Sequence, residues 1–341
     1  MKFLESLYIK AFINIIVSRD ETKIFVETFA KDKHLDSYEE SFDTLNVNEK
    51  ILEYLHNFTK QTPFYYVAYL DNSTMQGALP TCVKNEMALY QDLSACEYKC
   101  QDKKWTYYTA KTDLYEIERR YSKIGLDFIF SPFTLVSHFF KDKISEHFAG
   151  YILVQENLIT LTIFENGKLL YGESLNVEMY EAGDTLEDSL IEDEEDLDIV
   201  DDLEEGIDLD DISAIDELDS LDDFGDIEDL DSLDEMDDFT DDEDIEEEFN
   251  QEVENITHEP VAVVSNEDYQ RFTLIQNAIN RYYHDENYES KFLETIYIAD
   301  GVGVSTILKQ YFEEEMFINI YVRNVDIAQE LSSLSQIEVL K

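Results

Sequence analysis

The feature that most constrains this chain is a block of 71 residues, 184–254, that contains 38 acidic residues and no lysine or arginine. Like charges at this density oppose compaction, and few residues remain to offset the entropy lost on ordering. Apolar residues recur at every third position from Leu209 to Phe239. A step of three residues turns an α-helix by about 300°, so this stripe drifts around the helix and makes no single apolar face. We therefore expect residues 181–257 to be a disordered acidic insertion.

Two interpretations of this insertion stay open. It is a solvated tether, or it orders on a basic partner, in which case the protein is an acidic adaptor that works through residues 184–254. The insertion lacks the pattern of a helical calcium loop, in which Asp or Asn alternates before a Gly and a distal Glu. Loop-closure entropy grows only with the logarithm of length, so a long insertion between ordered elements costs little more than a short one.

Outside the acidic block the chain is only moderately acidic. The whole chain carries a net charge of −54, from 79 acidic and 25 basic residues. Without residues 184–254, 41 acidic and 25 basic residues remain, a net charge of −16 over 270 residues. This remainder is rich in Phe, Tyr, Ile and Leu and is long enough for one large domain or two smaller ones. Its negative charge disfavours nucleic acid and anionic lipid as partners.

The N-terminal sequence and the cysteines favour a cytoplasmic protein. The first apolar run, residues 11–17, is too short for a membrane span, and no small-residue cleavage pattern follows it. The chain has three cysteines, Cys82, Cys96 and Cys100. The spacing of Cys96 and Cys100 suits one face of a helix, and free thiols are expected, with a zinc site as the alternative.

Two series of strands and helices flank the insertion. The first series comprises a hairpin of residues 11–20 and 22–30, a helix at 46–61 capped by Asn46 or Asn48, strands at 64–70, 105–110 and 126–130, a turn at 76–82, and helices at 111–125 and 131–144, the last with Ser131 as its N-cap. The second comprises a meander of strands at 150–157, 158–167 and 168–177, a helix at 265–286 capped by Ser265, strands at 294–300, 317–322 and 336–341, and helices at 303–315 and 325–334.

Each series opens with antiparallel strands and then alternates helices with strands, which is the layout of a duplicated mixed α/β domain. The layout resembles the actin-like fold, in which two ribonuclease-H-like halves surround a cleft. We expect the first half to span residues 1–147 and the second to span residues 148–180 and 258–341, with the acidic insertion at 181–257 interrupting the second half.

Four segments, 64–81, 125–140, 150–177 and 294–322, are similar to the PilM family and to the cytoplasmic domains of the type II secretion protein GspL. The resemblance covers nearly all of the chain outside the insertion and is one of layout and hydrophobic texture. It implies a cytoplasmic scaffold, peripheral to the inner membrane, that docks the cytoplasmic tail of a PilN-like inner-membrane protein. The machine would be a type IV pilus, a type II secretion or DNA-uptake system, or a flagellar motor that has adopted PilM, PilN and PilO-like parts. Other cytosolic machine components and a homo-oligomer or ring are further implied partners.

Actin-like nucleotide enzymes hold phosphates on two hairpin turns, where glycine lets the backbone approach the phosphate and aspartate positions the metal. Neither corresponding turn has a glycine here, and only a third turn, between a strand and a helix, keeps a Gly-x-Gly pattern. The residues of this remnant cleft are Ser18, Arg19, Gln155, Glu156, Asn157, Asp300, Gly301 and Gly303.

A dinucleotide-binding role for Gly301 and Gly303 is disfavoured because too few residues follow them for the rest of such a domain. We expect both glycines to permit tight packing of a strand against a helix. The cleft is then expected to hold no nucleotide, metal or other cofactor, and the protein to be a scaffold rather than an enzyme. The alternative is an actin-like ATPase of a pilus or secretion assembly platform.

Overall fold

The computed structural model describes residues 8–31, 33–43, 46–177 and 261–340, all of which belong to one compact unit. The acidic insertion expected at 181–257 lies outside the described residues. No helix in the described part of the chain combines the length and the apolar character that crossing a membrane requires.

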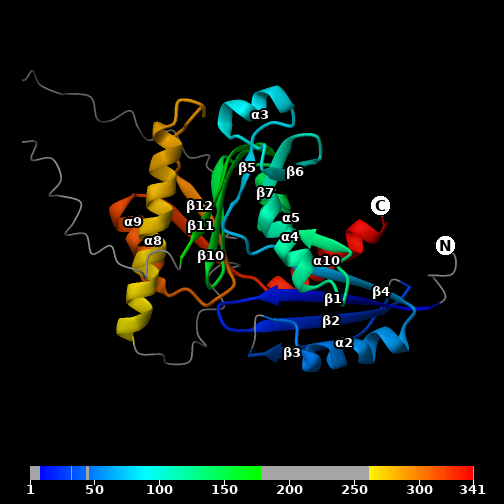
Figure 1. Ribbon diagram of the computed structural model, residues 1–341. Helices are drawn as coiled ribbons and strands as arrows, with labels where there is room; N and C mark the ends of the chain where they lie inside the picture. Colours follow the sequence, from blue (N-terminus) through cyan, green and yellow to red (C-terminus); the bar gives the residue numbers. More distant parts are fainter. Residues whose placement is uncertain (1–7, 32, 44–45, 178–260, 341) are drawn as a thin grey trace, which may run out of the picture. The chain divides into compact units, whose positions relative to one another are not determined.

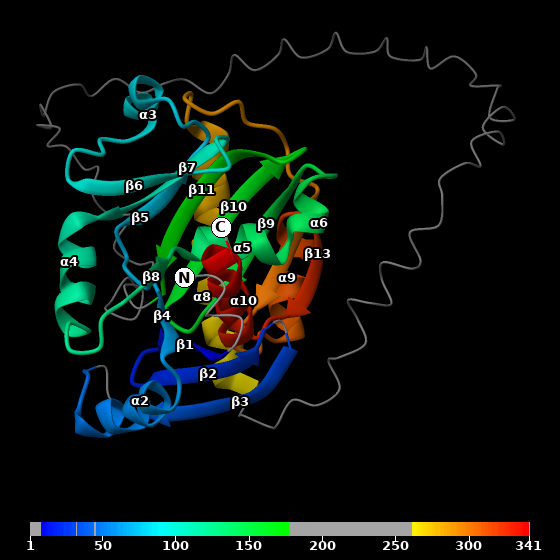
Figure 2. The ribbon, with the colours of Figure 1, turned by 90° about the vertical axis from the view of Figure 1, so that its right-hand side faces the viewer.

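The first sheet has five strands in the order β3-β2-β1-β4-β8; β1 to β4 are labelled in Figure 1 and β8 in Figure 2. β1 (Ile9–Val17), β2 (Thr22–Ala30) and β3 (Lys33–Phe42) form an antiparallel meander. β4 (Phe64–Leu70) pairs in parallel with β1, and β8 (Phe128–Phe130) pairs in parallel with β4. The order is therefore a three-stranded meander followed by two parallel strands.

The second sheet repeats this order in its first five strands. β9 (Ala149–Val154), β10 (Leu158–Glu165) and β11 (Lys168–Asn176) form the meander. β12 (Thr295–Asp300) pairs in parallel with β9, and β13 (Asn319–Asn324) pairs in parallel with β12. Because both sheets have the same unusual strand order, the chain is a duplicated ribonuclease-H-like, actin-like α/β protein, and the predicted fold class is confirmed.

Residues between β4 and β8 extend the second sheet rather than the first. β5 (Gln76–Leu79) pairs with β11, and β7 (Trp105–Ala110) and β6 (Cys96–Gln101) follow it outward. β11 approaches β5 closely at Gly172, where a Cβ atom would lie 2.6 Å from the Ala78 Cβ. The lobe of β5, β6 and β7, with the short helix α3 (Lys84–Tyr90), thus joins the two halves.

Helices cover the sheets in layers (Figure 2). One hydrophobic cluster joins the outer face of the first sheet to α2 (Glu49–Gln61) and α4 (Lys111–Arg120). A second cluster lies between the two sheets, around α5 (Pro132–Phe139) and α10 (Ile327–Leu340). A third joins the outer face of the second sheet to α8 (Val261–His284) and α9 (Thr306–Glu315). A single turn, α6 (Lys141–Ile144), follows α5.

Local chemistry explains where several helices begin. The Asn48 side chain accepts from the Ile51 N–H at 3.0 Å and caps α2, so of the two predicted caps it is Asn48 that is used. The Ser131 hydroxyl accepts from the Phe133 N–H at 3.3 Å, which confirms the predicted cap of α5. In the central layer, Ser332 of α10 donates to the buried Glu27 carboxylate of β2 and so ties the last helix to the first sheet.

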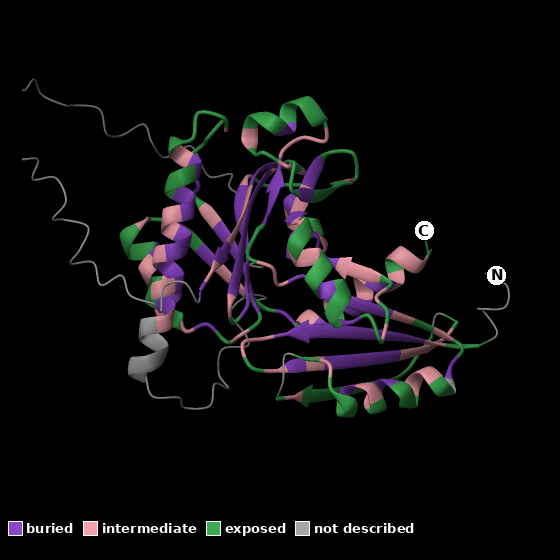
Figure 3. Ribbon diagram, viewed as in Figure 1, coloured by how far each residue is buried: buried purple, intermediate pink, exposed green. Residues whose placement is uncertain are grey.

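Three sequence-based expectations for secondary structure are wrong, and one further strand was not expected. The turn expected at 76–82 contains β5, whose four residues are buried. The strand expected at 336–341 is the continuation of α10 to Leu340. α8 begins at Val261, so Ser265 lies inside the helix and does not cap it. β3 was not expected, because nine of its ten residues are exposed and give no buried stripe (Figure 3).

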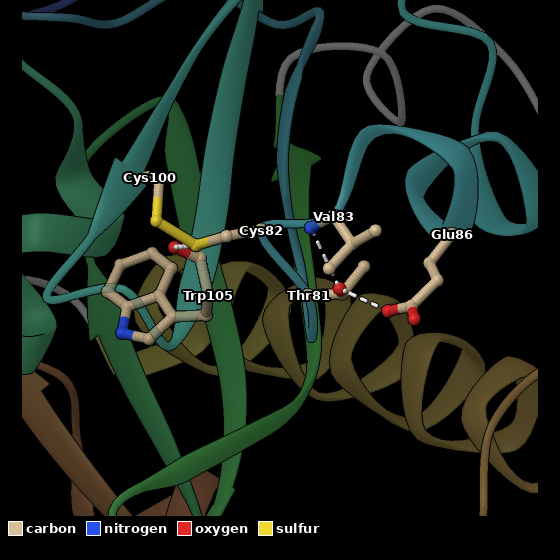
Figure 4. The surroundings of a disulfide bond; sticks show 6 residues. All are labelled: Thr81, Cys82, Val83, Glu86, Cys100 and Trp105. Atoms are coloured by element: carbon tan, nitrogen blue, oxygen red, sulfur yellow. Dashed lines mark hydrogen bonds between the residues drawn. A yellow bond between two sulfur atoms is a disulfide. The ribbon is translucent and has the colours of Figure 1, made fainter.

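The expectation of free thiols is wrong for Cys82 and Cys100, which form a disulfide (Figure 4). Cys96 and Cys100 lie on β6, not on a helix, and the register of β6 on β7 places Cys100 opposite Thr106. The Cys82 Sγ lies 3.2 Å from the Trp105 carbonyl oxygen, beside the same stretch of β7. Cys96 is free, and burial raises the pKa of its thiol. Among the described residues no group of His, Cys, Asp or Glu is arranged to hold a metal.

Candidate functional site: a cleft and an edge groove

The three turns singled out in the sequence meet around one cavity of about 410 Å³, which we call the cleft. The β1–β2 turn, the β9–β10 turn and the β12–α9 turn contribute to its wall together with the first residues of α10. Of the predicted site residues, the cleft is lined by Ser18, Gln155, Glu156, Asn157 and Gly301. The residues Lys23, Glu39 and Asp326 also line it and were not expected from the sequence.

The two hairpin turns contact each other. The backbone N–H of Arg19, in the β1–β2 turn, donates at 3.3 Å to Glu156 Oε2, in the β9–β10 turn. Gln155 is buried, and its Oε1 has no hydrogen-bond partner among the residues that the structure describes. The Glu156 carboxylate therefore already accepts from the Arg19 N–H, a backbone donor of the kind that a phosphate at these turns would need.

The third turn is organised around the Asp300 carboxylate, which is 5% exposed. Its Oδ1 accepts from the N–H groups of Val302 at 3.0 Å and Gly303 at 2.8 Å, and its Oδ2 accepts from the Val304 N–H at 2.8 Å. The Gly301 N–H donates to the Val154 carbonyl at 3.0 Å. Asp300 and Gly303 thus form the turn behind the cleft wall.

The start of α9 is satisfied in the same way. Asp268 of α8 is fully buried, and its Oδ2 accepts from the Ser305 N–H at 2.9 Å and from the Ser305 hydroxyl. Its Oδ1 accepts from Arg271 Nη1 at 2.8 Å. Every backbone N–H from residue 301 to residue 305 therefore donates to an oxygen of the protein itself. Residues 301–305 thus present no free N–H group to an anion. In the first turn of α9 itself, the Ile307 N–H donates to the Ser305 hydroxyl at 3.2 Å.

The two glycines of this turn have different physical roles. A Cβ at Gly301 would lie 2.6 Å from Ile327 Cδ1 and 2.9 Å from the Val154 carbonyl oxygen, so Gly301 allows α10 to pack closely. Gly303 has open space around its Cα but a φ of +85°, which an L side chain rarely adopts. The expected tight packing therefore describes Gly301 and not Gly303.

The charge of the cleft also opposes a phosphate. Glu21, Glu39, Glu156 and Asp326 line it, and its one lysine, Lys23, is paired with Glu39 at 3.1 Å. Asp326 Oδ1 accepts from the N–H groups of two residues of α10 and caps that helix as well. A carboxylate thus caps α10, whereas the Ser305 hydroxyl caps α9 and the Asp268 carboxylate accepts from Ser305.

A second site, which sequence reasoning missed, lies between β8 and the lobe of β5, β6 and β7. Two adjoining cavities of about 410 and 430 Å³ share Lys99, Tyr107, Asp127, Phe128 and Ile129 and form one depression, the edge groove. Within the described residues β8 is an edge strand of the first sheet and β6 is an edge strand of the second. Both edge strands border the same groove. No motif in the sequence predicts this groove, because the two strands belong to different sheets.

The floor and rim of the edge groove are acidic. Asp71, Glu97, Glu118 and Asp127 line its first cavity, with Lys99 as the one basic residue there. The buried Asp71 carboxylate accepts from the Ser73 N–H at 2.9 Å and from the Thr109 hydroxyl at 2.8 Å. Burial nevertheless raises the pKa of Asp71, because the desolvation of the charged form outweighs these hydrogen bonds. The groove is thus suited to an extended segment that carries positive charge.

Solved structures with a similar fold include a protein of unknown function with an actin-like ATPase fold from Bacteroides thetaiotaomicron, with 11% identity, 97% of each chain covered and a TM-score of 0.49. A PilM-PilN type IV pilus biogenesis complex has 9% identity, 94% coverage of each chain and a TM-score of 0.45. The ethanolamine utilization protein EutJ from Carboxydothermus hydrogenoformans has 8% identity, covers 94% of this chain and 86% of its own, and has a TM-score of 0.36. The fold assignment rests on the repeated strand order rather than on these values.

No curated protein matches the chain. Two family models do, and neither has an assigned role. Residues 8–137 match a domain of unknown function, DUF8569, and residues 151–340 match a second one, DUF8341. The second match covers more than half of the chain, so the protein belongs to the family described as Domain of unknown function (DUF8341).

Proposed function

We propose that the protein is a non-catalytic cytoplasmic scaffold of an envelope-spanning machine, and that it binds the cytoplasmic tail of a PilN-like inner-membrane protein. The observation that carries the proposal is the set of backbone N–H groups at residues 301–305, all of which donate to oxygens of the protein. An ATPase on this fold needs free donors at that turn. The proposal therefore assigns the actin-like frame to binding a protein instead of turning over a nucleotide.

The edge groove supports the choice of an extended tail as the partner. An edge strand offers unpaired backbone groups, and a peptide that pairs with it gains main-chain hydrogen bonds plus a few side-chain anchors. Here β8 and β6 border one groove, and Phe128, Ile129 and Tyr107 supply apolar contact area. Asp71, Glu118 and their neighbours favour basic residues in the tail.

The similarity to a PilM-PilN complex supplies the class of machine in this proposal, a type IV pilus assembly or a related secretion, DNA-uptake or flagellar system. The edge groove suits such a tail in any of these machines. It requires only a membrane partner whose cytoplasmic tail is extended, partly apolar and basic.

The test uses the full chain and the intact membrane partner that co-purifies with it. Glu118 lies on α4 and lines the groove, whereas Glu116 is exposed on the same helix and does not. We expect Glu118→Lys to weaken binding of this partner roughly tenfold, because it replaces an attraction with a repulsion at short range. Glu116→Lys is the matched control and should leave the affinity nearly unchanged. Equal effects of the two substitutions would mean that the groove is not the docking site.

A further inference from the structure

Two phenylalanines at one end of the second sheet, where β12 and β13 begin, are exposed in a way that the fold does not require. Phe292 is 64% exposed and Phe317 is 82% exposed. They precede β12 and β13, which are parallel strands that pair Thr295 with Asn319, so both residues lie at the same end of the sheet, where the two strands begin. The Asn319 N–H donates to the Glu294 carbonyl at 2.9 Å and ties the two segments together.

The backbone at Phe317 is the less expected of the two. Its φ is +56°, the left-handed region, directly after the C-cap of α9 at Met316. Helices often end with such a residue, but it is usually glycine, because a Cβ raises the energy of this conformation. The Ile318 N–H donates to the Phe312 carbonyl at 3.3 Å and helps to hold the turn. The chain thus keeps a bulky aromatic residue where glycine would be favoured and points it toward solvent.

The backbone on both sides of Phe292 is hydrogen-bonded to two tyrosines in the last turn of α8. The Tyr283 hydroxyl accepts from the Leu293 N–H at 2.9 Å, and the Tyr282 hydroxyl accepts from the Lys291 N–H at 3.1 Å. The Phe292 ring is nearly parallel to the Tyr283 ring, with centroids 6.3 Å apart and an angle of 8° between the planes. In Figure 1 this segment is the orange loop that leaves the upper end of α8. A ring fixed in advance loses little freedom on binding.

The surroundings of the two rings are acidic. Glu294 is exposed beside Phe292, and the exposed residues Glu313, Glu314 and Glu315 end the helix that leads to Phe317. The nearby lysines are paired, Lys291 with Glu165 and Lys309 with Glu313. Such a rim repels anionic lipid and attracts a basic protein surface.

We propose that Phe292 and Phe317 form an aromatic docking pair for a second protein, one that presents an apolar pocket rimmed by lysine or arginine. The pair shares no residue with the edge groove or the cleft. The proposal goes beyond the binding of a membrane tail, because it gives the scaffold a second contact through which a cytosolic component of the same machine is attached.

The experiment places the photocrosslinker p-benzoylphenylalanine at position 317 of the full chain in its own cells. The control carries it at position 115, because Tyr115 is 64% exposed but lies on α4. We expect one protein to be crosslinked from position 317 and not from position 115. That protein, identified and purified, should bind the unmodified chain with an affinity that falls as salt rises and at least tenfold on Phe317→Gly.

Two results would overturn the proposal. Crosslinks confined to a second copy of this chain or to lipid, or no crosslink at all, would exclude a basic protein partner. Thermal unfolding gives a readout that needs no partner: Phe317→Gly should raise the melting temperature, because it relieves the left-handed backbone and removes an exposed ring. A lower melting temperature would mean that the ring serves the fold and not a partner.

Discussion

Replacing Asp300 with alanine separates a structural carboxylate from a catalytic one. In this structure Asp300 accepts three backbone hydrogen bonds and is 5% exposed. A carboxylate that positions a metal for a nucleotide enzyme would contribute little to folding, since its task requires it to face the ligand. The two roles therefore predict different effects of Asp300→Ala on stability.

The magnitude follows from where the three donors lie. The Val304 N–H is buried and loses its partner completely, at a cost of about 2 kcal/mol, whereas water can reach the exposed Gly303 N–H and limits that loss to about 0.5 kcal/mol. The half-buried Val302 N–H should cost about 1 kcal/mol. Asp300→Ala should thus destabilise the protein by about 3–4 kcal/mol, equivalent to a fall of about 8 °C in Tm for a chain of this size.

The assay is urea or thermal unfolding followed by circular dichroism on the full chain. Asp285 is the control, because it makes a comparable turn on the surface, accepting from the Asn287 N–H at 2.9 Å, and its loss should cost less than about 1 kcal/mol. Asp300→Asn keeps one acceptor and should fall between the two. If Asp300→Ala leaves Tm unchanged or raises it, the carboxylate does not hold the turn and the argument against a nucleotide site loses its basis.

Three further predictions concern charge, packing and redox state. Burial raises the pKa of Asp71, so the stability that its protonated form contributes is complete below the ordinary aspartate pKa of about 4 and is lost as pH rises through the higher pKa of the folded state. Asp71→Asn should therefore flatten the fall in the free energy of unfolding across that pH range. An unchanged slope in this variant would contradict the raised pKa. Gly301→Ala should lower the free energy of unfolding by about 2 kcal/mol, because it forces a Cβ against α10, and adding Ile327→Ala should recover part of this loss. An unchanged free energy of unfolding in a denaturant titration of Gly301→Ala would show that the contact is loose. The Cys82–Cys100 bond closes a loop with a sequence separation of 18, and reducing it should cost about 3 kcal/mol in the same titration. Disulfides are rare in the cytosol, so alkylation in intact cells should find both thiols reduced if the proposed location is right, and full oxidation there would contradict that location.

The elements that the sequence predicted well are those whose burial pattern is periodic or whose caps are explicit. The hairpin of β1 and β2, the meander of β9 to β11 and the caps Asn48 and Ser131 belong to this class. β3 was missed because a strand exposed on both faces has no apolar stripe and is defined only by its pairing with β2.

β5 was missed for the opposite reason. Its four residues are buried, but Gln76 and Gly77, close before Pro80, have the composition of a turn, and its partner β11 lies far along the chain. The disulfide was missed because a spacing of four suggested a helix face, whereas the true partner of Cys100 is Cys82, in the segment between β5 and α3.

The sequence predicted which turns line the cleft, but not the hydrogen bonds that their backbone N–H groups make. The absence of glycine at Ser18 and Glu156 was visible in the sequence, and the structure brings both residues to the same cavity. That Asp300 accepts hydrogen bonds from the N–H groups of its own turn, and that Asp268 does the same at the start of α9, depends on backbone geometry that no motif encodes. The edge groove depends on two sheets meeting and was likewise not visible.

The central claim is that the protein's own carboxylates occupy the donors that a nucleotide phosphate would need. Isothermal titration of the full chain with ATP and Mg²⁺ tests it most directly. The account predicts no saturable binding tighter than about 1 mM, which corresponds to about −4 kcal/mol. A Kd in the low micromolar range, about −8 kcal/mol, that disappears in the Asp300→Ala variant would contradict it.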